Sequence, residues 1–339
     1  VDCDARGAVP RPVGFADDAD RNSWRDRPNP LVDLQIAAPL KMDALVVRLG
    51  VAVDFLEASM SSADIRIALI NPLAPRLPNA PKLSISQFTH VLRASFPLLS
   101  ARSEVADARS EKIAETVARY IGDGATIQTG IGKIPGQIFR KITDRKNLRL
   151  HSGILSQDIR LLAEAGALAA DNPATSPSAI GDEAFYGWLN GNPVLELAPV
   201  AHTHARETLA RLEKFVTINS AIEVDLLGRV NAEWIGPRRV SAPGGLPNFS
   251  RAAAECSDGV SIVALPSTDR SGAVSRIRPH LQDGIEPTVD WRDVDVVVTE
   301  HGAADLRGLD AAGRAAALIT VAAPDHRRVL SDSLDVAVR

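Results

Sequence analysis

The sequence predicts an α/β protein with a largely parallel sheet. Residues 216–228, 260–267 and 294–302 form apolar runs that read as strands and end in polar or glycine turns. Helical patterns separate several of these runs, and such alternation is typical of parallel sheets with helices on their faces. Ligands bind beyond the carboxyl ends of such strands, so we expect the turns after them to line one edge of the sheet.

The preceding part of the chain supplies one further strand and the clearest helix. Residues 66–71 read as a buried strand, and residues 71–81 hold four prolines, which predict a loop. Residues 101–124 predict a helix that ends at Gly122 or Gly124. Its apolar residues recur with a period of about 3.6, namely Val105, Ala108, Ile113, Val117 and Ile121.

A glycine loop joins a strand to a helix in GATIQTGIGKIP, residues 124–135. Glycines at such a junction let the backbone approach a ligand, and the helix N-terminus offers unpaired N–H groups to an anion. Pro135 suits the first turn of that helix. The glycine spacing fits no nucleotide-binding motif. We expect Gln128, Gly130 and Gly132 to contact the substrate.

A second junction lies at residues 148–168, LRLHSGILSQDIRLLAEAGAL, which read as a strand, a tight turn and a helix. Enzymes of the α/β class often keep a reactive group at such a turn. The residue at its apex is Gly153, which has no side chain, and His151 and Ser152 come just before it. We expect these three residues to lie at the substrate.

Composition limits the class of protein. The chain has 339 residues, of which 45% are hydrophobic and 24% charged, as in a globular protein of two ordinary domains. The formal net charge of −4 argues against a nucleic-acid partner, and no apolar run is long enough to span a membrane. The two cysteines form neither a metal motif nor a disulfide framework. The first residues lack the apolar core of a signal peptide, so we expect a cytoplasmic protein, with residues 1–30 as an irregular arm.

The chain contains seven segments in a fixed order: GATIQTGIGKIP, LRLHSGILSQDIRLLAEAGAL, NPVLEL, INSAIEVDLLGRVNAEWIG, GGLPNF, ALPSTDRSGAVSRIRP and VVVTEHGAADLRG. This series resembles the acetyl-CoA hydrolase/transferase family, which includes acetate and 4-hydroxybutyrate CoA-transferases. The resemblance implies two CoA-transferase-like α/β domains with the active site between them. Residues 31–104 would be an incomplete first domain and residues 105–339 the second. We also expect a homodimer.

The resemblance implies a glutamate that attacks an acyl-CoA and then carries CoA as a thioester. Family members hold this glutamate in a segment similar to HTEMFSDGV, which corresponds here to HSGILSQDI. Gly153 therefore stands at the glutamate position, and the match continues without a gap through residues 164–166. We expect no glutamyl-CoA intermediate, and we expect space beside Gly153 for a water, an amine or an alcohol.

The resemblance also indicates which other active-site groups this chain has besides the position of the glutamate. The family's GVGG segment, whose backbone N–H groups polarise the thioester carbonyl, corresponds to residues 242–245 and implies this role for Gly244 and Gly245. A family asparagine close to the catalytic glutamate corresponds to His204, in AHTHARE. A histidine can take a proton from an attacking group and hand it to the leaving thiolate, so His204 is our candidate general base. The alternative for His204 is a solvent-facing loop residue.

Further candidates lie at the ends of later strands. His301 replaces the tyrosine of the family's TEYG segment, and Glu300 precedes it. Glu300 is expected either to orient a histidine or the substrate, or to stabilise the turn. We expect Asn219 and Arg276 to bind the substrate, with Arg276 near an anionic part of CoA; an exposed arginine is the alternative.

We therefore expect an enzyme that uses coenzyme A in the form of acyl-CoA. The preferred reaction is acyl transfer to a small acceptor, or thioester hydrolysis, without a glutamyl intermediate. True CoA transfer through another carboxylate and non-catalytic acyl-CoA binding are the alternatives. His202 and His204 have the spacing of a metal pair, but no carboxylate or cysteine cluster accompanies them, so we expect no metal.

Overall fold

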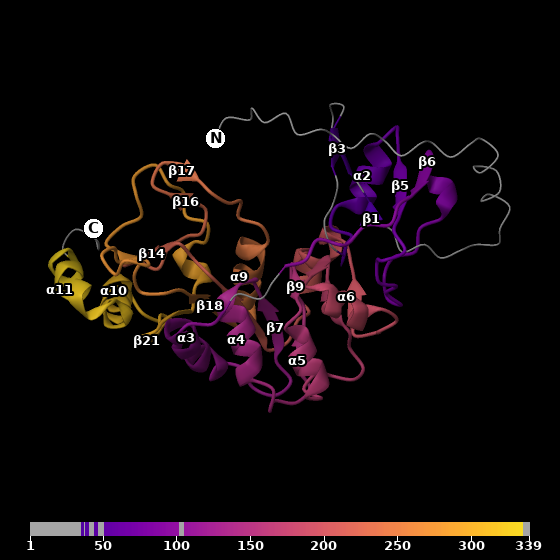
Figure 1. The fold of residues 1–339 in the computed structure, drawn as a ribbon. Helices are drawn as coiled ribbons and strands as arrows, with labels where there is room; N and C mark the ends of the chain where they lie inside the picture. Colours follow the sequence, from indigo (N-terminus) through magenta and orange to yellow (C-terminus); the bar gives the residue numbers. More distant parts are fainter. Residues whose placement is uncertain (1–34, 37, 41–43, 47–50, 102–104, 335–339) are drawn as a thin grey trace.

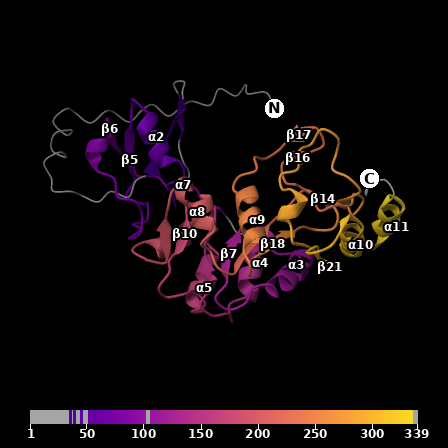
Figure 2. The ribbon, with the colours of Figure 1, turned by 180° about the vertical axis from the view of Figure 1, so that it is seen from behind.

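The computed structural model describes residues 35–36, 38–40, 44–46, 51–101 and 105–334 (Figure 1). The irregular arm expected over residues 1–30 lies outside this range. Helices and strands alternate along most of the described chain, and the predicted α/β class is confirmed. Helices α10 and α11 lie at one end of the molecule, and the strands near residues 67–93 lie at the other, in both views (Figures 1 and 2).

A six-stranded sheet forms the centre of the fold, in the order β21-β20-β18-β13-β7-β8. Its strands are parallel except for β21, which pairs antiparallel with β20. Strands β13, β18 and β20 are buried on both faces, which explains their apolar runs in the sequence. The bounds are β7 Thr126–Thr129, β8 Arg149–Leu150, β13 Phe215–Asn219, β18 Val260–Ala264, β20 Val296–Thr299 and β21 Gly302–Asp305.

Helices cover the two faces of this sheet. Helices α3 (Ala108–Ala118) and α4 (Lys133–Lys141) share one hydrophobic core with Ile127, Ile218 and Ile262 of the sheet. Helix α9 (Leu246–Glu255) packs on the opposite face, where Phe249 and Ala253 meet Phe215. Helices α3, α4 and α5 (Ile159–Glu164) lie side by side in both views (Figures 1 and 2).

The helix expected over residues 101–124 is shorter than its apolar pattern indicates. The side chain of Asp107 accepts a hydrogen bond from the amide of Ser110, which caps the N-terminus and fixes the helix start at Ala108. Val105, which the pattern placed in the helix, is 84% exposed. Ile121 is buried in the turn after the helix, and Gly124 has a positive φ of 73° that ends this region.

The strands expected over residues 216–228 and 294–302 are each two strands. Strand β13 ends at Asn219, and β14 (Glu223–Asp225) joins a different sheet with β15 (Val230–Asn231) and β19 (Ile277–Arg278). Strand β20 ends at Thr299, and the chain turns back as β21. The strand expected over 260–267 stops at Ala264.

The first part of the described chain forms smaller sheets. Strand β5 (Ile67–Ile70) pairs with β6 (His90–Arg93) and with β1 (Gln35–Ile36), and β2 (Ala38–Leu40) pairs with β3 (Ala44–Val46). Strand β5 was expected to be buried, but Ala68 is its only buried residue. The small sheet that contains β5 has few neighbouring side chains that could cover the others. The expected loop over 71–81 contains no helix or strand longer than a single bridge.

One strand from this part joins the later chain. Strand β4 (Val51–Ala52) pairs antiparallel with β11 (Ser178–Ile180), which pairs in turn with β9 (Leu155–Ser156). The division of the chain into domains at residue 104 remains a prediction. The remaining elements are α2 Leu56–Ser62, η1 Ile85–Gln87, β10 Ala174–Ser176, α6 Glu183–Leu189, β12 Leu195–Leu197, α7 Val200–Thr203, α8 Arg206–Leu209, β16 Trp234–Ile235, β17 Arg238–Arg239, η2 Trp291–Asp293, α10 Ala311–Val321 and α11 Pro324–Asp332.

Candidate active site

The segment 148–168 runs from the edge of the central sheet into a helix, as predicted. The amide of His151 donates to the carbonyl of Ile127 at 3.0 Å, and the amide of Ser152 donates to the carbonyl of Thr175 at 3.0 Å. The first bond continues the pairing of β8 with β7, and the second joins Ser152, directly before Gly153, to strand β10. The short strand β9 and helix α5 then follow. Gly153 therefore lies at the carboxyl edge of the sheet, where ligands of such folds bind.

Three segments distant in sequence meet at Gly153. A Cβ atom built on Gly153 would lie 3.3 Å from Nε2 of His204 and 3.3 Å from Cε2 of Phe249. A Cβ atom built on Gly245 would overlap Nε2 of His204 and lie 2.6 Å from Cε2 of Phe249. The edge of the His204 ring thus fills the gap between the two glycines. The space expected beside Gly153 for an acceptor is occupied by this imidazole.

His204 is half-buried directly after helix α7, not fully exposed on a loop. Its ring lies against Phe249, with the ring centroids 4.6 Å apart. Its Nδ1 is hydrogen-bonded to the hydroxyl of Thr203 at 2.9 Å. Burial lowers the pKa of His204, and the nearby His151 lowers it further. The neutral ring, which can accept a proton, is therefore favoured near neutral pH.

The two residues before Gly153 face the backbone. Nε2 of His151 donates to the carbonyl of Thr203 at 2.7 Å, and burial lowers the pKa of His151. Ser152 is fully buried, and its hydroxyl lies 2.8 Å from the carbonyl oxygen of Thr129 and 3.0 Å from that of Ile154. In this structure both side chains hold the turn in place. Their predicted contact with substrate remains a prediction.

The loop Gly244–Gly245 leads directly into helix α9. Gly244 has a φ of +56°, a left-handed conformation that favours glycine, and α9 begins at Leu246. Among the described residues, none accepts a hydrogen bond from the amides of Gly244 or Gly245. Such amides at the N-terminus of a helix attract negative charge. The loop can therefore stabilise an oxyanion close to His204.

A second group of predicted residues gathers around Ser267. The carboxylate of Glu300 accepts hydrogen bonds from the Ser267 amide at 2.8 Å and from its hydroxyl at 2.9 Å. Arg276 is half-buried, and burial lowers its pKa; the carboxylates of Asp269 and Glu300 oppose that effect. The side chain of His301 is exposed. The carboxylate of Glu300 is thus engaged in holding a turn, one of the two roles expected for it.

The remaining predicted residues lie at the ends of strands β7 and β13. The side-chain amides of Gln128 and Asn219 are buried and exchange two hydrogen bonds, of 3.1 and 2.8 Å. Gly130 and Gly132 follow, and a Cβ atom at either position would meet open space. Gly132 precedes helix α4 with a φ of 121°. This glycine loop is open toward solvent at the same edge of the sheet as Gly153.

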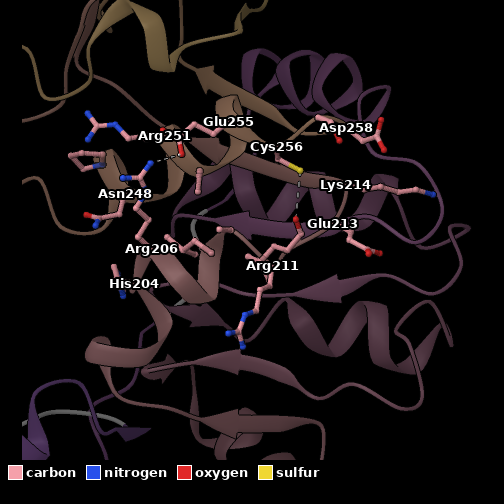
Figure 3. Close-up of a pocket in the computed structure, with 16 residues that line it drawn as sticks. His204, Arg206, Arg211, Glu213, Lys214, Asn248, Arg251, Glu255, Cys256 and Asp258 are labelled. Carbon is pink, nitrogen blue, oxygen red and sulfur yellow. Dashed lines mark hydrogen bonds and ion pairs between the residues drawn. The ribbon is translucent and has the colours of Figure 1, made fainter.

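A groove of about 1280 Å³ leads away from His204. It lies between helix α8 with the loop after it and helix α9, and Figure 3 shows His204 at one end and Lys214 at the other. Arg206 pairs with Glu255 at 3.7 Å in its wall. Cys256 lies partly buried there, with its thiol 3.5 Å from the carbonyl of Leu212.

The described ranges contain neither a membrane-spanning helix nor a cluster of metal ligands. No helix there is long and apolar enough to cross a membrane. No group of three or more His, Cys, Asp or Glu side chains in those ranges is arranged to hold a metal ion.

Comparison with known proteins assigns the family. Residues 181–334 match the acetyl-CoA hydrolase/transferase C-terminal domain. A 4-hydroxybutyrate coenzyme A transferase from Clostridium kluyveri is 35% identical over 287 residues, covering 83% of this chain and 67% of that protein. The chain belongs to the acetyl-CoA hydrolase/transferase family. The family membership predicted from the seven segments is thereby confirmed.

Other relatives agree with this assignment. An acetyl-CoA hydrolase from Kluyveromyces lactis is 32% identical over 223 residues, covering 62% of this chain and 40% of that protein. The crystal structure of RipA from Yersinia pestis has a TM-score of 0.80 and 29% identity, covering 85% of this chain and 66% of that one. The chain spans 67%, 62% and 61% of the length of three curated relatives that it matches.

Two residues at the candidate site were missed in the sequence. Phe249 lies in the segment GGLPNF, where it reads as an ordinary core residue, and its ring contacts His204 only because α9 crosses the sheet at this point. Thr203 precedes His204 in AHTHARE, but no sequence pattern indicates that its hydroxyl meets the neighbouring ring. The only feature of the sequence that could have indicated Thr203 was its position next to the candidate base.

Proposed function

We propose that this protein transfers the acyl group of an acyl-CoA to a small acceptor, or hydrolyses the thioester, without a glutamyl-CoA intermediate. The observation that carries the proposal is the position of His204, whose Nε2 faces both Gly153 and Gly245. A group that can accept a proton thus lies at the position where relatives are expected to hold a glutamate. The family relatives, which are CoA transferases and acetyl-CoA hydrolases, support acyl-CoA as the substrate.

The proposed reaction uses the amides of Gly244 and Gly245 and the ring of His204. The amides donate to the thioester carbonyl oxygen and stabilise the negative charge that develops on it; one such donor contributes about 3 kcal/mol. The acceptor attacks the carbonyl carbon while Nε2 of His204 takes its proton. The carbon–sulfur bond then breaks, CoA leaves as a thiolate, and His204 returns the proton to the sulfur.

The proposal also covers the route of the acceptor, the binding of CoA and the assembly of the protein. The groove beside His204 provides a route for the acceptor, because it opens to solvent between α8 and α9. We propose that Arg276 contacts an anionic part of CoA and that Glu300 holds the turn at Ser267 next to it. We further propose that the protein acts as a cytoplasmic homodimer in which residues 31–104 and 105–339 form two domains.

Mass spectrometry of the intact protein tests the missing intermediate. We expect no acyl-CoA to leave a CoA adduct on any glutamate, because Gly153 offers no carboxylate. The protein is incubated with a panel of acyl-CoAs, with and without amine and carboxylate acceptors. Its mass is read directly, which would show bound CoA, and again after borohydride or hydroxylamine, which release CoA from a glutamyl thioester and leave an alcohol or a hydroxamate on the glutamate. Free CoA and acylated acceptor are measured in the same samples.

Each result of that experiment selects one function. Release of CoA with an unchanged protein mass supports the proposal. A CoA adduct mapped to a glutamate would show true CoA transfer through another carboxylate. Tight binding of acyl-CoA without any turnover would show a binding protein. An acyl group on His204 would show that this ring attacks the thioester itself.

Gly153→Glu is expected to gain CoA-transferase activity and to lose the native reaction. The new side chain would start 3.3 Å from His204 and Phe249, so these rings must shift by a few tenths of an ångström. The rest of the glutamate side chain needs more room than its Cβ atom, so we expect the imidazole to leave its place and the carboxylate to lie beside the Gly245 amide. Formation of acyl-CoA from a free carboxylate, and the CoA adduct on the protein, are the measurements.

Gly153→Gln is the matched control, because it has the same size and no nucleophile. We expect it to lose the native reaction without gaining CoA transfer. A folded Gly153→Glu variant with full native activity would show that Gly153 does not border the reacting groups.

A further inference from the structure

Thr203 is a fully buried polar residue in direct contact with the candidate base. It ends helix α7, and its hydroxyl lies 3.3 Å from the carbonyl oxygen of Pro199, one helical turn earlier. The same hydroxyl lies 2.9 Å from Nδ1 of His204. The first of these bonds is common for a threonine in a helix. The second bond joins Thr203 directly to the ring of the candidate base.

Counting hydrogens assigns the two bonds. A hydroxyl has one hydrogen to donate and two lone pairs that accept. When the Thr203 hydroxyl donates to Pro199, it accepts from His204, and Nδ1 of His204 must carry the proton. Both contacts are then hydrogen bonds. Nε2 is left unprotonated.

The opposite assignment leaves a donor without a partner. Among the described residues, none is hydrogen-bonded to Nε2 of His204, which faces Gly153, Gly245 and the edge of Phe249. A proton on Nε2 would be an unpaired N–H group in a half-buried place, and such a group costs more than an unpaired lone pair. The surroundings of both ring nitrogens therefore favour the same tautomer.

His151 holds the other side of Thr203. A carbonyl can only accept, so Nε2 of His151 carries a proton and donates it to the Thr203 carbonyl at 2.7 Å. His151 is buried and follows β8, the edge strand of the six-stranded sheet, and its amide is bonded to the carbonyl of Ile127, which makes it a rigid support. This bond fixes the end of α7, from which both the Thr203 hydroxyl and the His204 ring project.

We propose that Thr203 is a positioning residue that fixes His204 as the Nδ1–H tautomer, so that the unprotonated Nε2 faces Gly153 and Gly245. Thr203 touches no substrate in this arrangement, and it acts through His204. The tautomer follows from the contacts alone, whereas its effect on turnover rests on the proposed function of His204 as a general base. The identity of the protonated nitrogen decides whether His204 can take a proton from an acceptor, because only a free lone pair can do so.

The tautomer can be measured directly in the full-length protein. Histidines are labelled with 15N, and long-range proton–nitrogen correlations are recorded near pH 8, well above the ordinary histidine pKa of about 6.5. Protonated and unprotonated ring nitrogens differ widely in 15N chemical shift, and the spectrum of His204→Gln identifies the signals of His204. We expect Nδ1 to be the protonated nitrogen. A proton on Nε2 of the wild-type protein would overturn the proposal.

Two variants of Thr203 complete the test. Thr203→Val keeps the shape and removes the hydroxyl, so we expect the Nε2–H tautomer to become populated and kcat/KM to fall by about tenfold to a hundredfold. Thr203→Ser keeps the hydroxyl, and we expect it to retain both the tautomer and most of the activity. An unchanged tautomer in Thr203→Val would overturn the proposal. A changed tautomer with unchanged kcat/KM would uphold it and would refute the general-base role of His204. If the valine variant does not fold, the wild-type spectrum and Thr203→Ser still decide the tautomer.

Discussion

His204→Gln is expected to lower kcat/KM by about a hundredfold or more, within the usual range for the loss of a general base. Glutamine has a similar reach and can still form a hydrogen bond to Thr203, but it does not exchange protons near neutral pH. The affinity for acyl-CoA should change little, because in the proposed site the backbone amides of Gly244 and Gly245, and not this side chain, hold the thioester. Steady-state kinetics and calorimetric binding of a non-hydrolysable acyl-CoA analogue measure the two quantities separately.

His301→Gln is the matched control for this variant. His301 also departs from the family pattern, but its side chain is exposed and lies in the turn after Glu300. We expect His301→Gln to keep near-native turnover. If it abolishes activity while His204→Gln does not, the base is His301. If both variants turn over normally, the acceptor arrives already deprotonated or another group serves it.

The pH dependence provides a second measure of His204 in the same pair of proteins. Burial lowers the pKa of His204 below its ordinary value, and a positive charge on the nearby His151 lowers it further. A base must be unprotonated to act, so activity that depends on His204 is present above this lowered pKa and is lost as the pH falls through it. We expect kcat/KM to hold through the ordinary value of about 6.5 and to fall only at lower pH. This acid limb should be missing in His204→Gln.

The fold could be predicted from the sequence where residues close together in the chain determine the structure. Strands buried on both faces require continuous apolar runs, and β13, β18 and β20 appear as such runs in the sequence. The predicted ends were less accurate. Strand β13 stops at Asn219, whose amide pairs with Gln128 of a neighbouring strand, and a contact between residues so far apart leaves no local pattern. The start of α3 did carry a local signal, the cap at Asp107, but the apolar period outweighed it.

The candidate site, too, could be predicted from the sequence only in part. The motif series assigned Gly153, His204 and Gly245 to three separate segments of one site, and the structure brings all three together. The contact of Phe249 with His204 depends on how α9 crosses the sheet, which no single segment encodes. The predicted space beside Gly153 was wrong for a related reason. A missing side chain leaves a cavity only when no other group fills the space, and here the His204 ring fills it.

Gly245→Ala is expected to lower kcat/KM as strongly as the loss of His204 itself, by about a hundredfold or more. The added methyl group would overlap Nε2 of His204 and lie 2.6 Å from Phe249. Phe249 is fully packed against Phe215 and the sheet, so the less buried imidazole is the group that moves. That movement takes Nε2 away from Gly153 and breaks the bond from Nδ1 to Thr203. Turnover, and the 15N signals of His204, report these two changes.

Gly244→Ala separates this steric effect from a general effect on the loop. Gly244 has the more demanding backbone, with a φ of +56°, so alanine there costs about 1–2 kcal/mol of stability. A methyl group on Gly244 would nevertheless meet no atom within 4 Å, and His204 would stay in place. We therefore expect Gly244→Ala to be the less stable of the two in thermal unfolding, yet to keep the wild-type His204 signals and more of the activity. Equal losses of activity in both variants, with the His204 signals unchanged, would show that the loop acts only through its amides and that its contact with the imidazole has no part in the reaction.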